Sequence, residues 1–167
     1  MKTYQLRIFP NQEQVNHLMN LSSIRMDVWN TLIEIQQNKY QTEKKIYSRF
    51  DLINLLPNLK NTSKPEWNQL NSKAIQTIAT EIYQSYSSFF KLIKKDNTAR
   101  PPKKKDINNI FHTIVFNQSG WSFKNNLLYI NKIPFQYSTH LENIKDLNIK
   151  EIRVKFKNNK WLVDLVC

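Results

Sequence analysis

Residues 97–106 read Asn-Thr-Ala-Arg-Pro-Pro-Lys-Lys-Lys-Asp, and the hydrophobic pattern of the chain changes at this stretch. Before it, apolar residues recur at spacings of three and four, which is typical of helices packed on a core. After it, short runs alternate between apolar and polar residues, which is typical of strands. Two adjacent prolines prevent a helix from continuing through the stretch itself. The sequence therefore predicts an α+β protein with a basic linker between its helical and strand-rich parts.

The strongest helical signal lies just before the linker. One apolar stripe, about five turns long, contains Ile75, Ile78, Ala79, Ile82, Tyr86, Phe89, Phe90 and Ile93. A first helix is expected to begin after Asn11, which forms a capping-box pattern with Gln14, and to run to about residue 39. A second helix is expected over residues 48–56, where Pro57 closes it and a polar connecting loop follows.

Strands are expected at both ends of the chain. Residues 3–9 alternate between two faces before Pro10 ends the run. Beyond the linker, further strand-like runs cover residues 111–116, 121–124, 127–130, 133–137, 151–157 and 161–166. The pairs Asn125-Asn126 and Asn158-Asn159 each separate two of these runs. Asn tolerates the positive φ that a two-residue hairpin loop needs, so both pairs predict tight hairpins.

The simplest architecture pairs the first strand with the C-terminal strands in a small antiparallel, wedge-like β-barrel. The helices would then form a lobe inserted into the barrel. The expected division of the chain is a first barrel strand at 1–10, an inserted helical lobe at 11–98, a basic linker at 99–106 and the remaining barrel strands at 107–167.

The charge of the chain favours a polyanionic partner. It carries 25 Lys and Arg against 13 Asp and Glu, a formal net charge of +12. Residues 99–167 alone hold 12 basic and 5 acidic residues. A basic surface can serve solubility only, but acidic surface serves that purpose at least as well. We therefore expect nucleic acid as the partner.

Several function classes are disfavoured. Cys167 is the only cysteine, so the chain cannot form an internal disulfide or a cysteine-based metal site, and a reducing, cytoplasmic location is expected. His17, His112 and His140 lie far apart and form no ligand-like spacing. No apolar run is long enough to span a membrane, and two-metal nuclease chemistry needs converging carboxylates that the sequence does not offer. We expect no catalytic residues, no metal, no cofactor and no membrane association.

Two clusters of cations are candidate contacts to phosphates. The linker carries Arg100, Lys103, Lys104 and Lys105 within six residues, where they either track a phosphate backbone or form a solvated loop. In the strand at 151–157, the basic residues face one way and Ile152, Val154 and Phe156 face the other. The basic side of this strand consists of Arg153, Lys155 and Lys157. No acidic residue alternates with these three, which favours a phosphate-binding ridge over an ordinary exposed face.

A third candidate cluster lies in the first helix. Arg25 and Asn30 can read base edges, and Trp29 between them can stack on a base. Trp29 also fits the apolar face of the helix, so core packing is favoured for it. On the first strand, the candidate nucleic-acid contacts are Lys2, Tyr4 and Arg7.

Several segments in a fixed order resemble one known family. They are residues 2–11 (Lys-Thr-Tyr-Gln-Leu-Arg-Ile-Phe-Pro-Asn), 29–33 (Trp-Asn-Thr-Leu-Ile), 70–76 (Leu-Asn-Ser-Lys-Ala-Ile-Gln), 89–91 (Phe-Phe-Lys), 100–105 (Arg-Pro-Pro-Lys-Lys-Lys) and 160–163 (Lys-Trp-Leu-Val). Together they resemble the front half of the TnpB (OrfB) proteins of insertion sequences, which are similar to the type V CRISPR effectors. The resemblance implies a wedge-like barrel and a helical recognition lobe that grip a guide RNA and a target DNA.

The chain departs from this family in two ways. Its basic stretch lacks the aromatic residue that the family usually carries there. The RuvC-like nuclease domain, with its catalytic acids and paired-cysteine zinc element, is absent, so cleavage cannot be carried over. Residues 161–167 are apolar on both strand faces, which suggests a truncation or a split gene, with a separately encoded nuclease domain as a further partner. The alternative readings are a stand-alone helix-turn-helix DNA-binding protein of transposase origin, a self-sufficient metal-dependent nuclease and a degenerate remnant.

Overall fold

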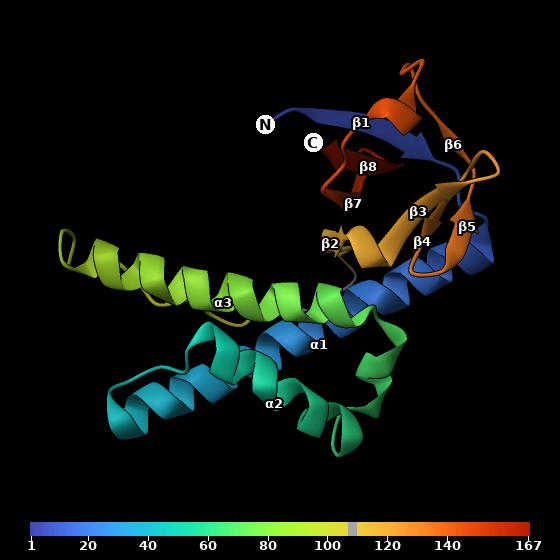
Figure 1. Cartoon of the computed structure of the whole chain (residues 1–167). Coiled ribbons are helices and arrows are strands. Elements are labelled where there is room, and N and C mark those ends of the chain that lie inside the picture. Colours follow the sequence, from blue (N-terminus) through green and yellow to red (C-terminus); the bar gives the residue numbers. More distant parts are fainter. Residues whose placement is uncertain (107–109) are drawn as a thin grey trace.

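The computed structural model of the chain describes residues 1–106 and 110–167. Residues 107–109, where the predicted strand-rich part begins, lie outside the described residues. The helices gather on one side of the molecule and the strands on the other, with both termini at the strand end (Figure 1). The protein is α+β, as predicted, whereas the proposed division into units stays a prediction.

The helical side contains α1 (Gln12–Glu43), α2 (Arg49–Asn61) and α3 (Ser72–Ile93), with a short 3₁₀ helix, η1 (Pro65–Gln69), between the last two. The predicted capping box at the start of α1 is confirmed. The Asn11 side chain accepts a hydrogen bond from the backbone N of Gln14 at 2.9 Å, and the Gln14 side chain accepts one from the backbone N of Asn11 at 2.9 Å. A second box, formed by Ser48 and Asp51, begins α2. These caps fix both helix starts because each satisfies backbone donors that have no partner inside the helix.

The expectation that Pro57 ends α2 is wrong, because the helix continues through it to Asn61. Leu52 and Leu56 are buried on the inner face of α2, and this packing outweighs the local cost of the proline. The expected connecting loop after Pro57 is likewise not a simple loop. It contains η1, in which Trp67 is fully buried.

The main sheet is antiparallel and has the strand order β2-β7-β8-β1-β6. Its strands are β1 (Thr3–Ile8), β2 (Ile114–Asn117), β6 (Tyr137–Ser138), β7 (Glu151–Lys157) and β8 (Lys160–Val166). The predicted pairing of the first strand with a C-terminal strand is confirmed, since β1 pairs with β8 along its whole length. A second sheet contains β3 (Trp121–Lys124), β4 (Leu127–Ile130) and β5 (Ile133–Phe135), and two short 3₁₀ helices, η2 (Gln118–Gly120) and η3 (Ile144–Asp146), complete the elements.

The expected wedge-like β-barrel is not supported, because the strands do not close into a barrel. Strands β2 and β6 form the two edges of the main sheet and do not pair with one another, and β3 to β5 form a separate sheet. The predicted strand at 133–137 splits at Gln136, so that β5 belongs to one sheet and β6 to the other. Alternation along a sequence predicts strands, but the closure of a barrel depends on which sheet edges meet. The edge strand β6 has only two residues and is too short to continue the sheet.

The predicted Asn-Asn hairpins are confirmed. Asn125 and Asn126 have φ of 53° and 61°, and Asn158 and Asn159 have φ of 53° and 58°. The first pair joins β3 to β4 and the second joins β7 to β8. Positive φ at both loop positions gives the twist that matches the flanking strands, so asparagine takes the place that glycine usually fills.

One hydrophobic core joins the helices to both sheets. Helix α3 packs against α1 on one side and against β2 on the other, and therefore lies between the helical and strand-rich parts. No helix in the described ranges combines the length and the hydrophobicity needed to cross a membrane.

Candidate nucleic-acid interface

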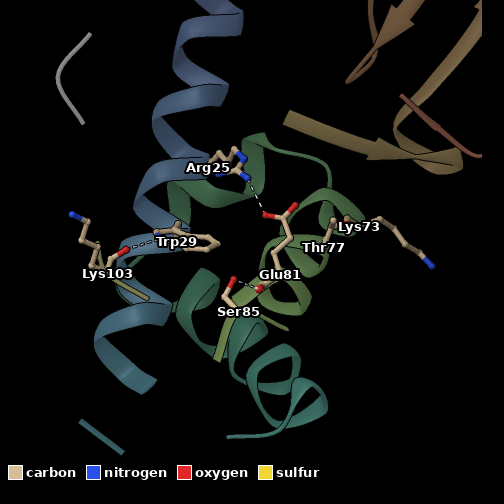
Figure 2. Close-up of polar contacts among 7 residues, drawn as sticks. All are labelled: Arg25, Trp29, Lys73, Thr77, Glu81, Ser85 and Lys103. Atoms are coloured by element: carbon tan, nitrogen blue, oxygen red, sulfur yellow. Dashed lines mark hydrogen bonds and ion pairs between the residues drawn. The ribbon is translucent and has the colours of Figure 1, made fainter. Parts of the chain in front are cut away.

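The backbone of the basic linker is held along α1 by hydrogen bonds with side chains of that helix. The indole Nε1 of Trp29 donates to the carbonyl oxygen of Lys103 at 3.1 Å (Figure 2). The Asn30 side chain binds Lys105 twice: its Nδ2 donates to the Lys105 carbonyl at 3.1 Å, and its Oδ1 accepts from the Lys105 backbone N at 2.8 Å. The linker is thus ordered where it crosses α1.

The linker side chains have different surroundings. Lys104 Nζ lies 3.2 Å from a carboxylate oxygen of Glu34, and Lys105 Nζ lies 4.2 Å from the centroid of the Trp29 ring. Arg100 and Lys103 are exposed. An ordered backbone with exposed cations is pre-organised for phosphate contacts, because less chain entropy is lost on binding.

We expect Asn30→Ala to release the linker from α1. It removes both hydrogen bonds to Lys105 and should lower the free energy of unfolding by about 1–2 kcal/mol. Limited trypsin digestion should then cut after Lys103–Lys105 faster than in the wild type. Asn38→Ala, an exposed position on the same helix, is the matched control. Equal digestion rates for the two variants would contradict the proposed anchoring.

Arg25 and Trp29 face the interior. Trp29 is 7 % exposed, which confirms the core packing favoured for it. The Arg25 guanidinium forms an ion pair with Glu81 of α3 at 2.9 Å, as Figure 2 shows, and its side chain is only 8 % exposed. Burial lowers the pKa of Arg25 from its usual value, and Glu81 opposes this shift. Since the Asn30 amide binds the linker, the predicted base-reading residues of α1 are engaged inside the protein.

The strand register brings the cations of three strands to one face of the main sheet. Arg153 lies opposite Asp164 of β8, which lies opposite Gln5 of β1. The next row consists of Lys155, Leu162 and Arg7. Directly opposed residues of antiparallel strands share a face, so the basic residues of this polar sheet face are Arg7, Arg153, Lys155, Lys157 and Lys160. Lys160 was not predicted for this face, because its place there depends on the β7–β8 register.

The opposite face of the sheet packs on the core. Ile152 and Val154 are fully buried there, as predicted. Phe156 is 43 % exposed at the end of the strand and packs on Trp161, with 4.7 Å between ring centroids. Tyr4 belongs to this face too and is half-buried against the core, whereas Lys2 is exposed just before β1.

The polar sheet face also carries two carboxylates, although no acidic residue stands between the three cations of β7. Glu151 lies two residues before Arg153 and binds its guanidinium at 2.7 Å. Lys155 forms an ion pair with Asp164, whose side chain is 9 % exposed and also accepts a hydrogen bond from Gln5 at 2.8 Å. Arg7 and Lys157 are exposed, and the Arg7 guanidinium lies 4.9 Å from the centroid of the Phe9 ring. The face therefore keeps a surplus of positive charge, although two of its cations have partners.

A groove of about 700 Å³ is lined by residues of α3, β2 and β7. Its lining includes Arg25, Arg153 and Lys155, which the sequence had placed in two separate clusters. Thr77, Thr80 and Gln84 of α3 line one wall, and Val115 and Asn117 of β2 line the other. Arg153 and Lys155 also belong to the polar sheet face, so the groove and that face form one continuous surface.

Within residues 1–106 and 110–167, no three His, Cys, Asp or Glu residues lie close enough together to hold a metal ion. The arrangement offers cations, amides and hydroxyls on an open surface. Such a surface can bind a phosphate backbone.

The N-terminal region of the chain matches a known family. Residues 1–45 match the family model of the helix-turn-helix domain of IS605 OrfB proteins. No curated protein matches the chain significantly. The matched residues fold as β1 and the single continuous helix α1, which extends to Glu43. The match supports DNA binding as the function class of this region.

Proposed function

Because the N-terminal region is that of an OrfB/TnpB-type insertion-sequence protein, we propose that the chain binds a structured, guide-like RNA together with DNA. In this proposal it forms the nucleic-acid-binding lobe of an RNA-guided nuclease system and has no cleavage activity of its own. The catalytic domain of such a system would lie outside these 167 residues.

The polar sheet face is the observation that supports this function best. Arg7, Arg153, Lys155, Lys157 and Lys160 lie on one side of an antiparallel sheet, next to the groove under α3. The anchored linker adds exposed cations along α1. Cations held on the sheet and on the anchored linker can neutralise phosphates and release the counterions bound to them.

RNA is favoured as one of the two partners by the family resemblance, since charge alone attracts RNA and duplex DNA alike. Contacts to the backbone carry no sequence information, so a guide RNA would supply the specificity by base pairing. The protein surface then needs only to contact the RNA backbone and to fit the shape of the folded RNA.

A stand-alone DNA-binding regulator is the second candidate, and the description of the matched family model as a helix-turn-helix domain favours it. Such a regulator places a short second helix in the major groove of DNA. In residues 1–45 the structure has one 32-residue helix, α1, and its Arg25 and Asn30 are engaged internally. This geometry favours backbone binding over base reading by α1.

A salt titration tests the proposal. Binding of a structured RNA, followed by fluorescence anisotropy, should weaken steeply as salt rises, with a log–log slope of about −3 or steeper for several phosphate contacts. No binding at low salt would refute nucleic-acid binding, and a slope near zero would refute binding through phosphate contacts.

We expect no cleavage of RNA or DNA in the presence of Mg²⁺ or Mn²⁺. The described residues provide no carboxylate cluster for two-metal chemistry. End-labelled RNA, single-stranded DNA and duplex DNA are incubated with the purified chain and resolved on denaturing gels. Cleavage that survives further purification and stops with EDTA would show that the chain is an enzyme.

A further inference from the structure

The Arg25 guanidinium is buried with only part of its hydrogen-bonding capacity used. Its Nη2 binds Glu81 at 2.9 Å, while its Nη1 is buried without a partner. An arginine has five N–H donors and no acceptors. A buried donor without a partner costs about 1–3 kcal/mol or more, so such a group calls for a water or an anion.

Arg25 lines the groove between α3 and the strands β2 and β7. Figure 2 shows its side chain projecting from α1 toward Glu81 of α3. The hydroxyls of Thr77 and Thr80 in the groove wall donate to carbonyls of their own helix. The amide of Asn117, on the β2 side, donates to Thr77 Oγ1 at 3.3 Å. These wall donors are occupied, whereas Arg25, which also lines the groove, has an Nη1 without a partner.

Two further titratable groups feel the charge of Arg25, although neither of them lines the groove. Burial lowers the pKa of Lys105, the charge of Arg25 lowers it further, and Glu81 opposes both effects. The pKa of His112 is lowered by burial and by the charges of Lys105 and Arg25, while its hydrogen bond to the Asp106 carbonyl and the Asp106 charge raise it. A bound anion lowers the electrostatic repulsion between like positive charges in a partly buried site.

The groove also opens onto cations at its rim. Arg153 and Lys155 line it, and the polar sheet face continues from them toward Lys157. Glu151 and Glu81 line it as well, so an anion has to compete with two carboxylates. An extended polyanion meets this condition better than a single small anion, because the neighbouring cations of the sheet face hold its flanking phosphates.

We propose that the groove binds one backbone phosphate of a nucleic acid, with Arg25 Nη1 as the buried donor and Arg153 at the rim. This inference rests on the proposed function and assigns to it a specific phosphate site. Arg25 then has two roles. Its Nη2 joins α1 to α3 through Glu81, and its Nη1 binds the nucleic-acid strand that passes over the groove.

The direct test observes Arg25 in the wild-type chain. The protein is labelled with ¹⁵N-arginine and titrated with the structured RNA of the salt titration, and in a second arm with inorganic phosphate. We expect the Arg25 guanidinium resonances to shift in proportion to RNA binding measured by anisotropy. Inorganic phosphate at an equal phosphate concentration should leave them nearly unchanged.

Each other outcome has a definite meaning. If the RNA binds while the Arg25 resonances stay in place, a water occupies Nη1 and the phosphate site is wrong, although nucleic-acid binding stands. If inorganic phosphate alone produces the shift, the site takes a small anion and the backbone assignment is wrong. If the RNA does not bind at all, both the site and the proposed function are wrong.

A conservative variant gives a second readout. Arg25→Lys keeps the charge beside Glu81 but loses the planar fork of donors, and RNA affinity should fall about tenfold. The control Lys145→Gln removes a positive charge at an exposed position outside the groove lining and should change affinity by no more than about twofold. Equal affinities for the two variants would overturn the proposal. If Arg25→Lys does not fold, the resonance titration decides on the wild type.

Discussion

Replacing Arg153, Lys155 and Lys157 together with glutamine is expected to weaken RNA binding about 30-fold near physiological salt. The three side chains share the polar sheet face, and two of them line the groove under α3. Each phosphate contact that is lost should also flatten the log–log salt dependence by about one unit. Binding isotherms at several salt concentrations give both quantities.

Glutamine is the informative replacement because of the ion pairs on this face. Reversal to glutamate would place new carboxylates beside Glu151 and the nearly buried Asp164. The loss of folding would then obscure the loss of binding. Adding Asp164→Asn to the triple variant removes the carboxylate that Lys155 neutralises. This further separates the effect on folding from the effect on RNA binding.

Lys91, Lys94 and Lys95 offer a matched control. They are exposed at the C-terminal end of α3, and their replacement by glutamine removes the same charge. The control variant should bind RNA with an affinity within about fivefold of the wild type. If both triple variants lose affinity equally, binding depends on net charge alone and the polar sheet face is not a specific contact.

Trp67→Ala is expected to destabilise the protein by about 4 kcal/mol, the largest stability effect that we predict for a single substitution. Trp67 is fully buried in η1, and its Nε1 donates to a carboxylate oxygen of Asp27 at 2.8 Å. Asp27 also binds Lys64 at 3.0 Å, so the tryptophan ties the segment after α2 to α1. Truncation leaves a large cavity and removes one partner of that carboxylate.

Urea unfolding of three variants measures this effect. Trp67→Phe keeps most of the packing and should cost clearly less than Trp67→Ala, because it loses mainly the hydrogen bond. Phe50→Ala removes an aromatic ring that is 66 % exposed and should stay within about 0.5 kcal/mol of the wild type. A Trp67→Ala variant as stable as Phe50→Ala would show that η1 does not pack as described.

Local signals in the sequence predicted the parts of the fold that local chemistry decides. The apolar stripe predicted α3, the Asn11–Gln14 pattern predicted the start of α1, and the two Asn-Asn pairs predicted hairpins. Each depends on residues within a few positions of one another. Tertiary packing explains where such reasoning failed, since α2 continues through Pro57 and Trp67 is buried within a polar segment.

The candidate interface was predictable only in part. Alternation put Arg153, Lys155 and Lys157 on one strand face, but Lys160 joins them only through the β7–β8 register. The carboxylates that bind Arg153 and Lys155 were missed in different ways. Glu151 was visible two residues before Arg153, whereas Asp164 comes from the neighbouring strand. The convergence of Arg25 with Arg153 across the groove depends on the packing of α3 against β2, which no local pattern encodes.

Competition between RNA and DNA tests the proposed function most directly. A labelled structured RNA bound to the chain is challenged at fixed salt with unlabelled structured RNA and with duplex DNA of equal length. We predict that the RNA competes about tenfold more strongly than the duplex, a difference of about 1.4 kcal/mol. Equal or stronger competition by plain duplex DNA would contradict the guide-RNA proposal and favour a DNA-binding regulator.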